Sequence, residues 1–119
     1  MKESVLKTKS YDFALRAIKL QQYLAAEQKE FVLSKQVLRS GTSIGANVEE
    51  AGQAQSKSDF IHKLSIAQKE AFETHYWIRL LRDSRMLTAS QADSLLADCE
   101  ELQKMITASI KTVKRNLST

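Results

Sequence analysis

Few residues in this chain are suited to bind a metal, and their spacing is wrong for it. There are two histidines, His62 and His75. Four-helix proteins that bind two metal ions use Glu-x-x-His motifs on inward helix faces. Neither histidine has a glutamate three residues before it, and Glu70 and Glu73 lie off the apolar positions of their segment. We therefore predict no metal site.

The candidate nucleophiles are equally poor. Cys99 is the only cysteine, and it falls on an apolar helical seam, which is typical of a small core residue. Ser43 lies among glycines with no base placed to activate it. Phosphate-binding loops, dinucleotide fingerprints and nucleophile elbows are missing from the sequence. We predict a protein that is not an enzyme and that binds no cofactor.

Basic residues gather at the two ends of a chain whose net charge is only +4. The N-terminal end carries Lys2, Lys7 and Lys9. Residues 102–119 contain no acid, and their basic residues are Lys104, Lys111, Lys114 and Arg115. We predict that these four bind nucleic acid through phosphate contacts, with little sequence readout. A second interpretation is that they only complement the dipole of a C-terminal helix end.

A polar strip offers a different kind of partner surface. Its residues are Arg39, Ser43, Asn47 and Glu50, spaced three or four apart on one helical face. On this interpretation the protein is a scaffold that binds another protein and does not contact nucleic acid.

Four amphipathic segments must position these residues. Apolar side chains recur at spacings of three and four, which predicts helices. The expected helices cover about Ser10–Gln28, Phe31 or Ser34 to Gln53, Ser56–Arg85, and the chain from Thr88 onward. Ser10 is the expected N-cap of the first helix. Capping-box patterns begin the third helix at Ser56 and the fourth at Thr88.

Each expected helix has one apolar seam for a shared core. The seams are Phe13, Ala17, Leu20 and Leu24; Val37, Gly41, Ile44, Val48 and Ala51; Phe60, Leu64, Ala67, Ala71, Thr74, Ile78 and Leu81; and Ala92, Leu95, Cys99, Leu102, Ile106, Ser109 and Val113. Short connections favour antiparallel neighbours. We predict an all-α, up-and-down antiparallel four-helix bundle, one domain over residues 1–119, with both termini at the same end.

All three glycines of the chain, Gly41, Gly45 and Gly52, fall in the second segment, where each costs a helix roughly 1 kcal/mol relative to alanine. They form one strip beside the seam, which predicts close packing against another backbone. That backbone belongs to the same bundle, to another subunit, or to a ligand such as a nucleic acid.

The third segment has more apolar surface than one bundle can bury. Its seam is complete without Ile61, Phe72 and Tyr76, which share a second stripe. An exposed apolar stripe of this size is typical of an interface. We therefore expect a homo-oligomer.

The composition fits a cytoplasmic protein. The chain has no proline and a single cysteine, as expected in a reducing compartment. No apolar run approaches the ~20 residues of a membrane span, and the N-terminus lacks the apolar stretch of a signal peptide.

Two segments carry a family resemblance: LSKQVLRSGTSIGANVEEA at residues 33–51 and SDFIHKLSIAQKEAFETHYWIRLL at residues 58–81. They resemble the 23S rRNA intervening-sequence proteins, often labelled ribosomal proteins. The matching residues are Ser34, Gln36, Arg39, Ser43, Ile44, Asn47, Glu50, Ala51, Lys69, Glu70, Ala71, Glu73, Thr74, Tyr76 and Trp77.

The resemblance implies a left-handed bundle that assembles as a homopentamer. It also implies a bacterial protein whose target is ribosomal RNA or its processing intermediates. A related branch, the accessory proteins of diversity-generating retroelements, implies RNA or DNA and a reverse transcriptase as partners. This chain is less basic than that branch.

Overall fold

The computed structural model describes residues 2–118, and it describes side chains from Val5 to Asn116. Within this range it contains four α-helices and no strand. They are α1 (Lys2–Glu27), α2 (Leu33–Ala51), α3 (Lys57–Asp83) and α4 (Ala89–Ser118). The connections, residues 28–32, 52–56 and 84–88, are short, so successive helices run antiparallel.

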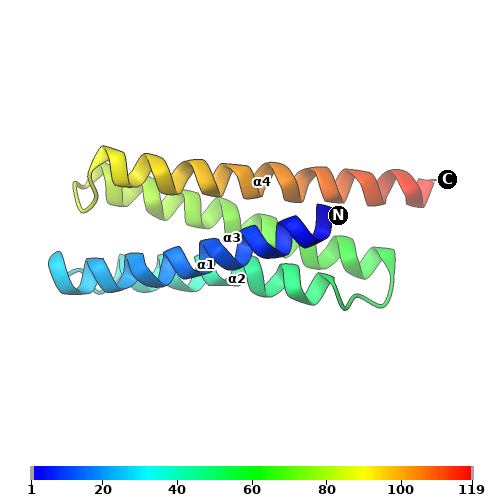
Figure 1. Ribbon diagram of the computed structural model, residues 1–119, viewed down its shortest axis with the longest axis horizontal. Helices are drawn as coiled ribbons and strands as arrows, with labels where there is room; N and C mark the ends of the chain where they lie inside the picture. Colours follow the sequence, from blue (N-terminus) through cyan, green and yellow to red (C-terminus); the bar gives the residue numbers. More distant parts are fainter. Residues whose placement is uncertain (1, 119) are drawn as a thin grey trace.

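The helices form an elongated bundle of 52 × 21 × 20 Å (Figure 1). Helix α1 packs mainly on α2, α2 on α3, and α3 on α4, while α1 and α4 make the weakest contact. Helices α1 and α3 are therefore diagonal neighbours. Both termini lie at the same end, and the last turns of α4 project beyond the start of α1 (Figure 1). The predicted up-and-down bundle is confirmed.

The predicted seams build the core. The seam residues of α1 and α2 are all buried. In α3 the seam is buried from Leu64 to Leu81, and in α4 it is buried from Ala92 to Ile106. Phe60, Ser109 and Val113 are half-buried because they lie at the end of the bundle where α4 outruns its neighbours. No helix in the described part of the chain is both long enough and apolar enough to cross a membrane.

Two of the three expected N-caps are correct. The Ser56 hydroxyl accepts a hydrogen bond from the Asp59 N–H at 3.0 Å. Thr88 and Gln91 form a reciprocal capping box at 2.9 and 3.1 Å.

The expected cap at Ser10 is wrong. Helix α1 continues back to Lys2, and Ser10 is buried inside it, with its hydroxyl donating to the Lys7 carbonyl at 3.1 Å. The first turns stay helical because Leu6 and Ser10 pack into the bundle.

Helix α2 is capped by a residue that the pattern did not reveal. The Glu30 carboxylate accepts the N–H groups of Val32, Leu33 and Ser34 at 3.1, 2.9 and 2.7 Å. Burial by itself raises the pKa of Glu30, but these backbone donors outweigh it and lower the pKa below its ordinary value.

Candidate functional site

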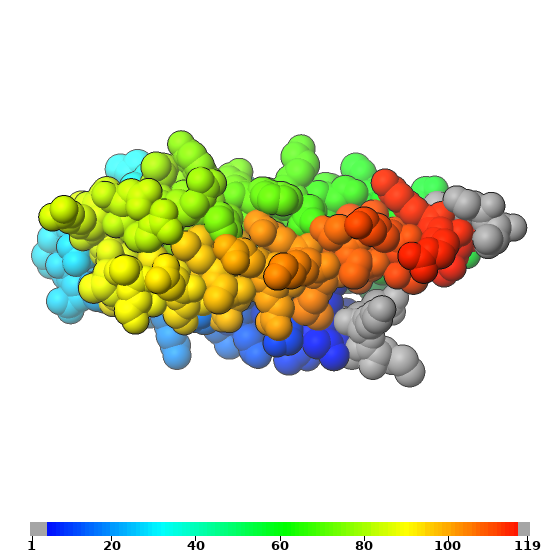
Figure 2. All heavy atoms as spheres, turned by 90° about the horizontal axis from the view of Figure 1, so that it is seen from above, coloured from blue at the N-terminus to red at the C-terminus, as the bar shows by residue number. Residues whose placement is uncertain are grey.

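The predicted nucleic-acid-binding residues all lie on the C-terminal half of α4. Lys104, Lys111, Lys114 and Arg115 are all exposed. Among the described side chains, Lys104, Lys111 and Arg115 have no acidic partner within ion-pair distance. In the face seen in Figure 2, no other helix lies in front of the later turns of α4 (orange to red). The arrangement leaves a row of positive charge facing solvent.

The N-terminal basic residues reach the same end of the bundle but are paired. Lys7 lies 3.9 Å from Glu49, and Lys9 lies 2.9 Å from Glu101. The hydrogen bond to Glu101 raises the pKa of Lys9 above its ordinary value. The side chain of Lys2 lies outside the described residues. Among the described side chains of this end, the cations without an acidic partner therefore lie mainly on α4.

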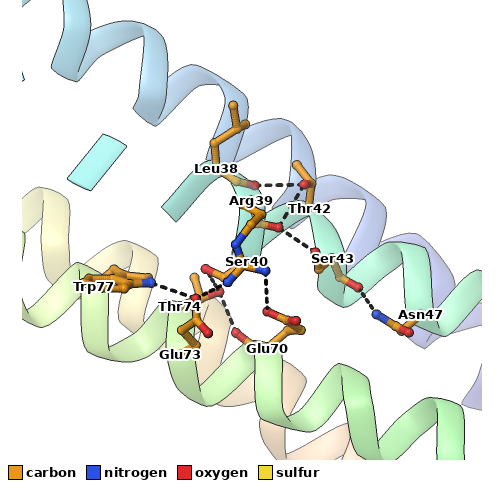
Figure 3. Close-up of polar contacts among 10 residues, drawn as sticks. All are labelled: Leu38, Arg39, Ser40, Thr42, Ser43, Asn47, Glu70, Glu73, Thr74 and Trp77. Atoms are coloured by element: carbon orange, nitrogen blue, oxygen red, sulfur yellow. Dashed lines mark hydrogen bonds and ion pairs between the residues drawn. The ribbon is translucent and has the colours of Figure 1, made fainter. Parts of the chain in front are cut away.

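The polar strip on α2 is engaged within the chain (Figure 3). The Ser43 hydroxyl donates to the Arg39 carbonyl at 2.7 Å, and the Asn47 amide donates to the Ser43 carbonyl at 2.8 Å. Glu50 accepts a hydrogen bond from Lys63 at 3.0 Å.

Arg39 joins α2 to α3. Its guanidinium pairs with Glu73 and lies 3.7 Å from Glu70, and Glu73 also accepts the Trp77 indole N–H at 3.1 Å (Figure 3). The family-pattern residues in this cluster therefore hold two helices together.

A buried hydroxyl pair continues this contact into the core. The Thr74 hydroxyl lies 2.8 Å from the Ser40 hydroxyl and 2.7 Å from the Glu70 carbonyl. Both side chains are fully buried. Buried hydroxyl groups need hydrogen-bond partners, and these contacts supply them.

The structure places two of the three glycines between α1 and α2. A Cβ atom added at Gly41 would lie 2.8 Å from the Ala17 Cβ, and one added at Gly45 would lie 3.2 Å from the Ser10 carbonyl oxygen. Gly52 is exposed at the end of α2. Of the contacts left open by the sequence, close packing inside one bundle is the one that Gly41 and Gly45 make.

The second apolar stripe of α3 is solvent-facing in the single chain. Phe72 is 59% exposed and Tyr76 47%, while Ile61 is half-buried. Helix α1 bears another exposed stripe: Tyr11, Leu15 and Ile18, at 62%, 45% and 39%. Sequence reasoning missed it, although the spacing of four and three was a readable signal.

The remaining candidate residues have structural surroundings. Cys99 is buried, its thiol donates to the Ala71 carbonyl at 3.2 Å, and burial raises its pKa to about 12. His75 lies 2.9 Å from Glu100. Among the side chains that the structure describes, no group of three His, Cys, Asp or Glu residues is arranged to hold a metal ion.

Comparison with known proteins identifies relatives but assigns no activity. No curated protein matches the chain. A crystal structure of a protein of unknown function from the S23 ribosomal protein family, from Bacteroides thetaiotaomicron, is 54% identical. It matches with a TM-score of 0.92 over 93% of this chain and 99% of that one. The family model described as 23S rRNA-intervening sequence protein matches residues 2–108, and the chain therefore belongs to that family.

Proposed function

We propose that this protein is a non-catalytic, cytoplasmic homo-oligomer that binds nucleic acid through the cations on the C-terminal half of α4. The family description points to ribosomal RNA or its processing intermediates as the target. The observation that carries the proposal is the concentration of cations on one stretch of α4. Residues 102–119 hold four basic residues and no acid, and among the described side chains Lys104, Lys111 and Arg115 have no acidic partner. Other cations without such a partner, among them Lys19 and Lys35, lie on different helices.

Unpaired cations gain most from a polyanion, because binding breaks no internal ion pair and releases counterions from the nucleic acid. Copies of the chain in one assembly would present several such rows, and avidity would then strengthen weak individual contacts.

Charge-matched double variants test the surface. Lys111→Gln with Arg115→Gln removes two charges from α4, and Lys19→Gln with Lys35→Gln removes two exposed charges elsewhere. We expect the α4 pair to weaken binding to a labelled RNA and to reduce the slope of log K against log salt by about 0.7 to 0.9 per charge. Equal effects of both pairs, or none from the α4 pair, would show that this surface is the wrong one.

The proposed oligomer would cover the α1 stripe of Tyr11, Leu15 and Ile18 together with Tyr76 of α3, since exposed apolar surface of this kind is typical of subunit contacts. Five copies, the number that the family resemblance implies, would have five times the 13.5 kDa mass of one chain. We expect Leu15→Glu on α1 or Tyr76→Glu on α3 to lower the mass found by light scattering. Ala97→Glu, on the exposed face of α4, is the control. A wild-type protein that stays monomeric at high concentration contradicts this part of the proposal.

A further inference from the structure

A shallow groove of about 320 Å³ runs between α3 and α4, beside the proposed nucleic-acid surface. Helix α3 contributes Gln68 and Phe72 to its lining. Helix α4 contributes Gln103, Lys104, Thr107 and Lys111. An aromatic ring and two cations thus border the same hollow.

Phe72 and its neighbour Tyr76 have different surroundings. Tyr76 packs edge-on against Trp77, with ring centroids 5.2 Å apart, and the Arg79 guanidinium lies 5.7 Å from the Tyr76 ring. Phe72 has no ring or cation stacked on it within the described residues, and it borders the groove. The sequence grouped both rings as subunit contacts, but the structure gives Phe72 a separate setting.

The groove wall also contains unmade hydrogen bonds. The Gln68 amide nitrogen donates to the Gln103 carbonyl at 3.2 Å and to the Thr107 hydroxyl. Within the described part of the chain, the Gln68 side-chain oxygen and the Gln103 side-chain nitrogen are buried and have no hydrogen-bond partner. Because both atoms are buried, a ligand in the groove would instead contact Phe72, Lys104 and Lys111 of its lining.

The two ends of the groove differ in charge. At the end away from the chain termini, Glu100 pairs with His75 at 2.9 Å, and its carboxylate would repel a phosphate. Toward the tip of α4, Lys104 and Lys111 stand two helical turns apart, about 10 Å, and Arg115 follows one turn later. A polyanion is therefore favoured from Phe72 toward the C-terminal end.

We infer that this groove binds single-stranded nucleic acid, with an unpaired base stacked on Phe72 and the backbone following Lys104, Lys111 and Arg115. The inference deepens the proposed function and rests on it. A duplex keeps its bases stacked on one another, so an exposed ring flanked by cations selects unpaired bases.

Phe72 variants test the inference without changing charge. Affinity is measured for single-stranded RNA, single-stranded DNA of the same sequence, and the corresponding duplex. We expect Phe72→Ala to weaken single-strand binding about tenfold or more, with the salt slope and duplex affinity unchanged. Phe72→Trp should retain binding. Phe31→Ala, which removes a similarly exposed aromatic from the connection between α1 and α2, should have no effect. A larger loss on RNA than on DNA, or the reverse, identifies the preferred polymer.

Three results would overturn the inference. One is unchanged single-strand affinity in Phe72→Ala. Another is an equal loss on the duplex. A third is a lower solution mass for Phe72→Ala, which would make Phe72 a subunit contact. The proposed function fails separately, when the Lys111 and Arg115 charges prove irrelevant to binding. A thermal melt of each variant confirms that the fold is intact.

Discussion

The two sides of α1 are held in different ways. Toward α2, Gly41 and Gly45 let the backbones approach until an added methyl group would collide with Ala17 or the Ser10 carbonyl. Toward α4, contact is sparser and includes two ion pairs: Lys9 pairs with Glu101 at 2.9 Å and Arg16 with Asp98 at 2.6 Å.

The contact between α1 and α2 is buried away from water and salt, whereas the ion pairs between α1 and α4 are exposed to both. The α1–α2 seam is buried, so its dispersion contacts do not depend on ionic strength. The charged pairs between α1 and α4 are largely exposed, and exposed pairs contribute little. We therefore expect α1 and α2 to be the more tightly held pair and the α1–α4 seam to contribute least to stability.

Of the substitutions considered, Gly41→Leu should reduce the free energy of unfolding most, because it disrupts the tight contact between α1 and α2. The new side chain meets the Ala17 Cβ, which cannot rotate away, and overpacking of this kind costs about 2–3 kcal/mol. The free energy of unfolding in urea measures the loss. Gly52→Leu is the matched control, because Gly52 is exposed, has an ordinary helical φ of −64°, and faces the flexible end of Lys7. Equal losses at both positions would mean that the α1–α2 seam is not tight.

Glu30→Ala tests the turn that joins these two helices. It removes the acceptor for three N–H groups of α2, and loss of an N-cap costs about 1 kcal/mol. Because the folded-state pKa of Glu30 is lowered, its contribution is complete above the ordinary pKa of 4.5 and is lost as pH falls through the lowered value.

The pH dependence supplies the check on that cap. The difference in unfolding free energy between wild type and Glu30→Ala should be largest at neutral pH and shrink in acid. Glu27→Ala, an exposed residue at the end of α1 with no capping role, should show no comparable difference. A difference for Glu30→Ala that is the same at pH 3 and pH 7 would rule out an ionised cap.

Local spacing predicted the framework well. The buried seams follow from apolar residues three and four apart, and the Thr88 box follows from side chains that reach only three residues. Ser10 misled the prediction because its residue type favours a cap, whereas the earlier turns gain more by packing Leu6 into the core. Tertiary burial outweighed a local preference.

Glycine placement was the harder feature. The helix ends that need positive φ are occupied by Lys29 at 55° and Arg85 at 66°, although glycine suits such positions best. The glycines instead serve the α1–α2 seam, where the requirement is set by a backbone far away in sequence. Their shared strip was visible, but the identity of the neighbouring backbone was not.

The sequence predicted which cations form the candidate site, but it could not predict which of them form ion pairs with acids from other helices. The cations of residues 102–119 stand out because no acid lies among them. Whether acids from other helices neutralise a lysine depends on the fold: Lys9 meets Glu101 across the bundle, whereas Lys111 meets none among the described side chains. The groove beside Phe72 likewise exists only once α3 and α4 are packed together.

Arg16→Gln tests the weaker contact, the one between α1 and α4. The change removes the pair with Asp98 and hydrogen bonds to the Ser94 carbonyl and hydroxyl at 3.3 and 3.1 Å, yet these groups are solvent-exposed. We expect a loss of only about 0.5 kcal/mol, smaller still in high salt because the charges are screened. Lys19→Gln, on the same helix and without an acidic partner among the described side chains, should have no such salt-dependent loss.

A double-mutant cycle with Asp98→Asn isolates the coupling energy of the Arg16–Asp98 pair. A coupling energy as large as the Gly41→Leu loss would mean that the α1–α4 seam holds the bundle as firmly as the glycine seam, and the contrast between the two sides of α1 would not stand.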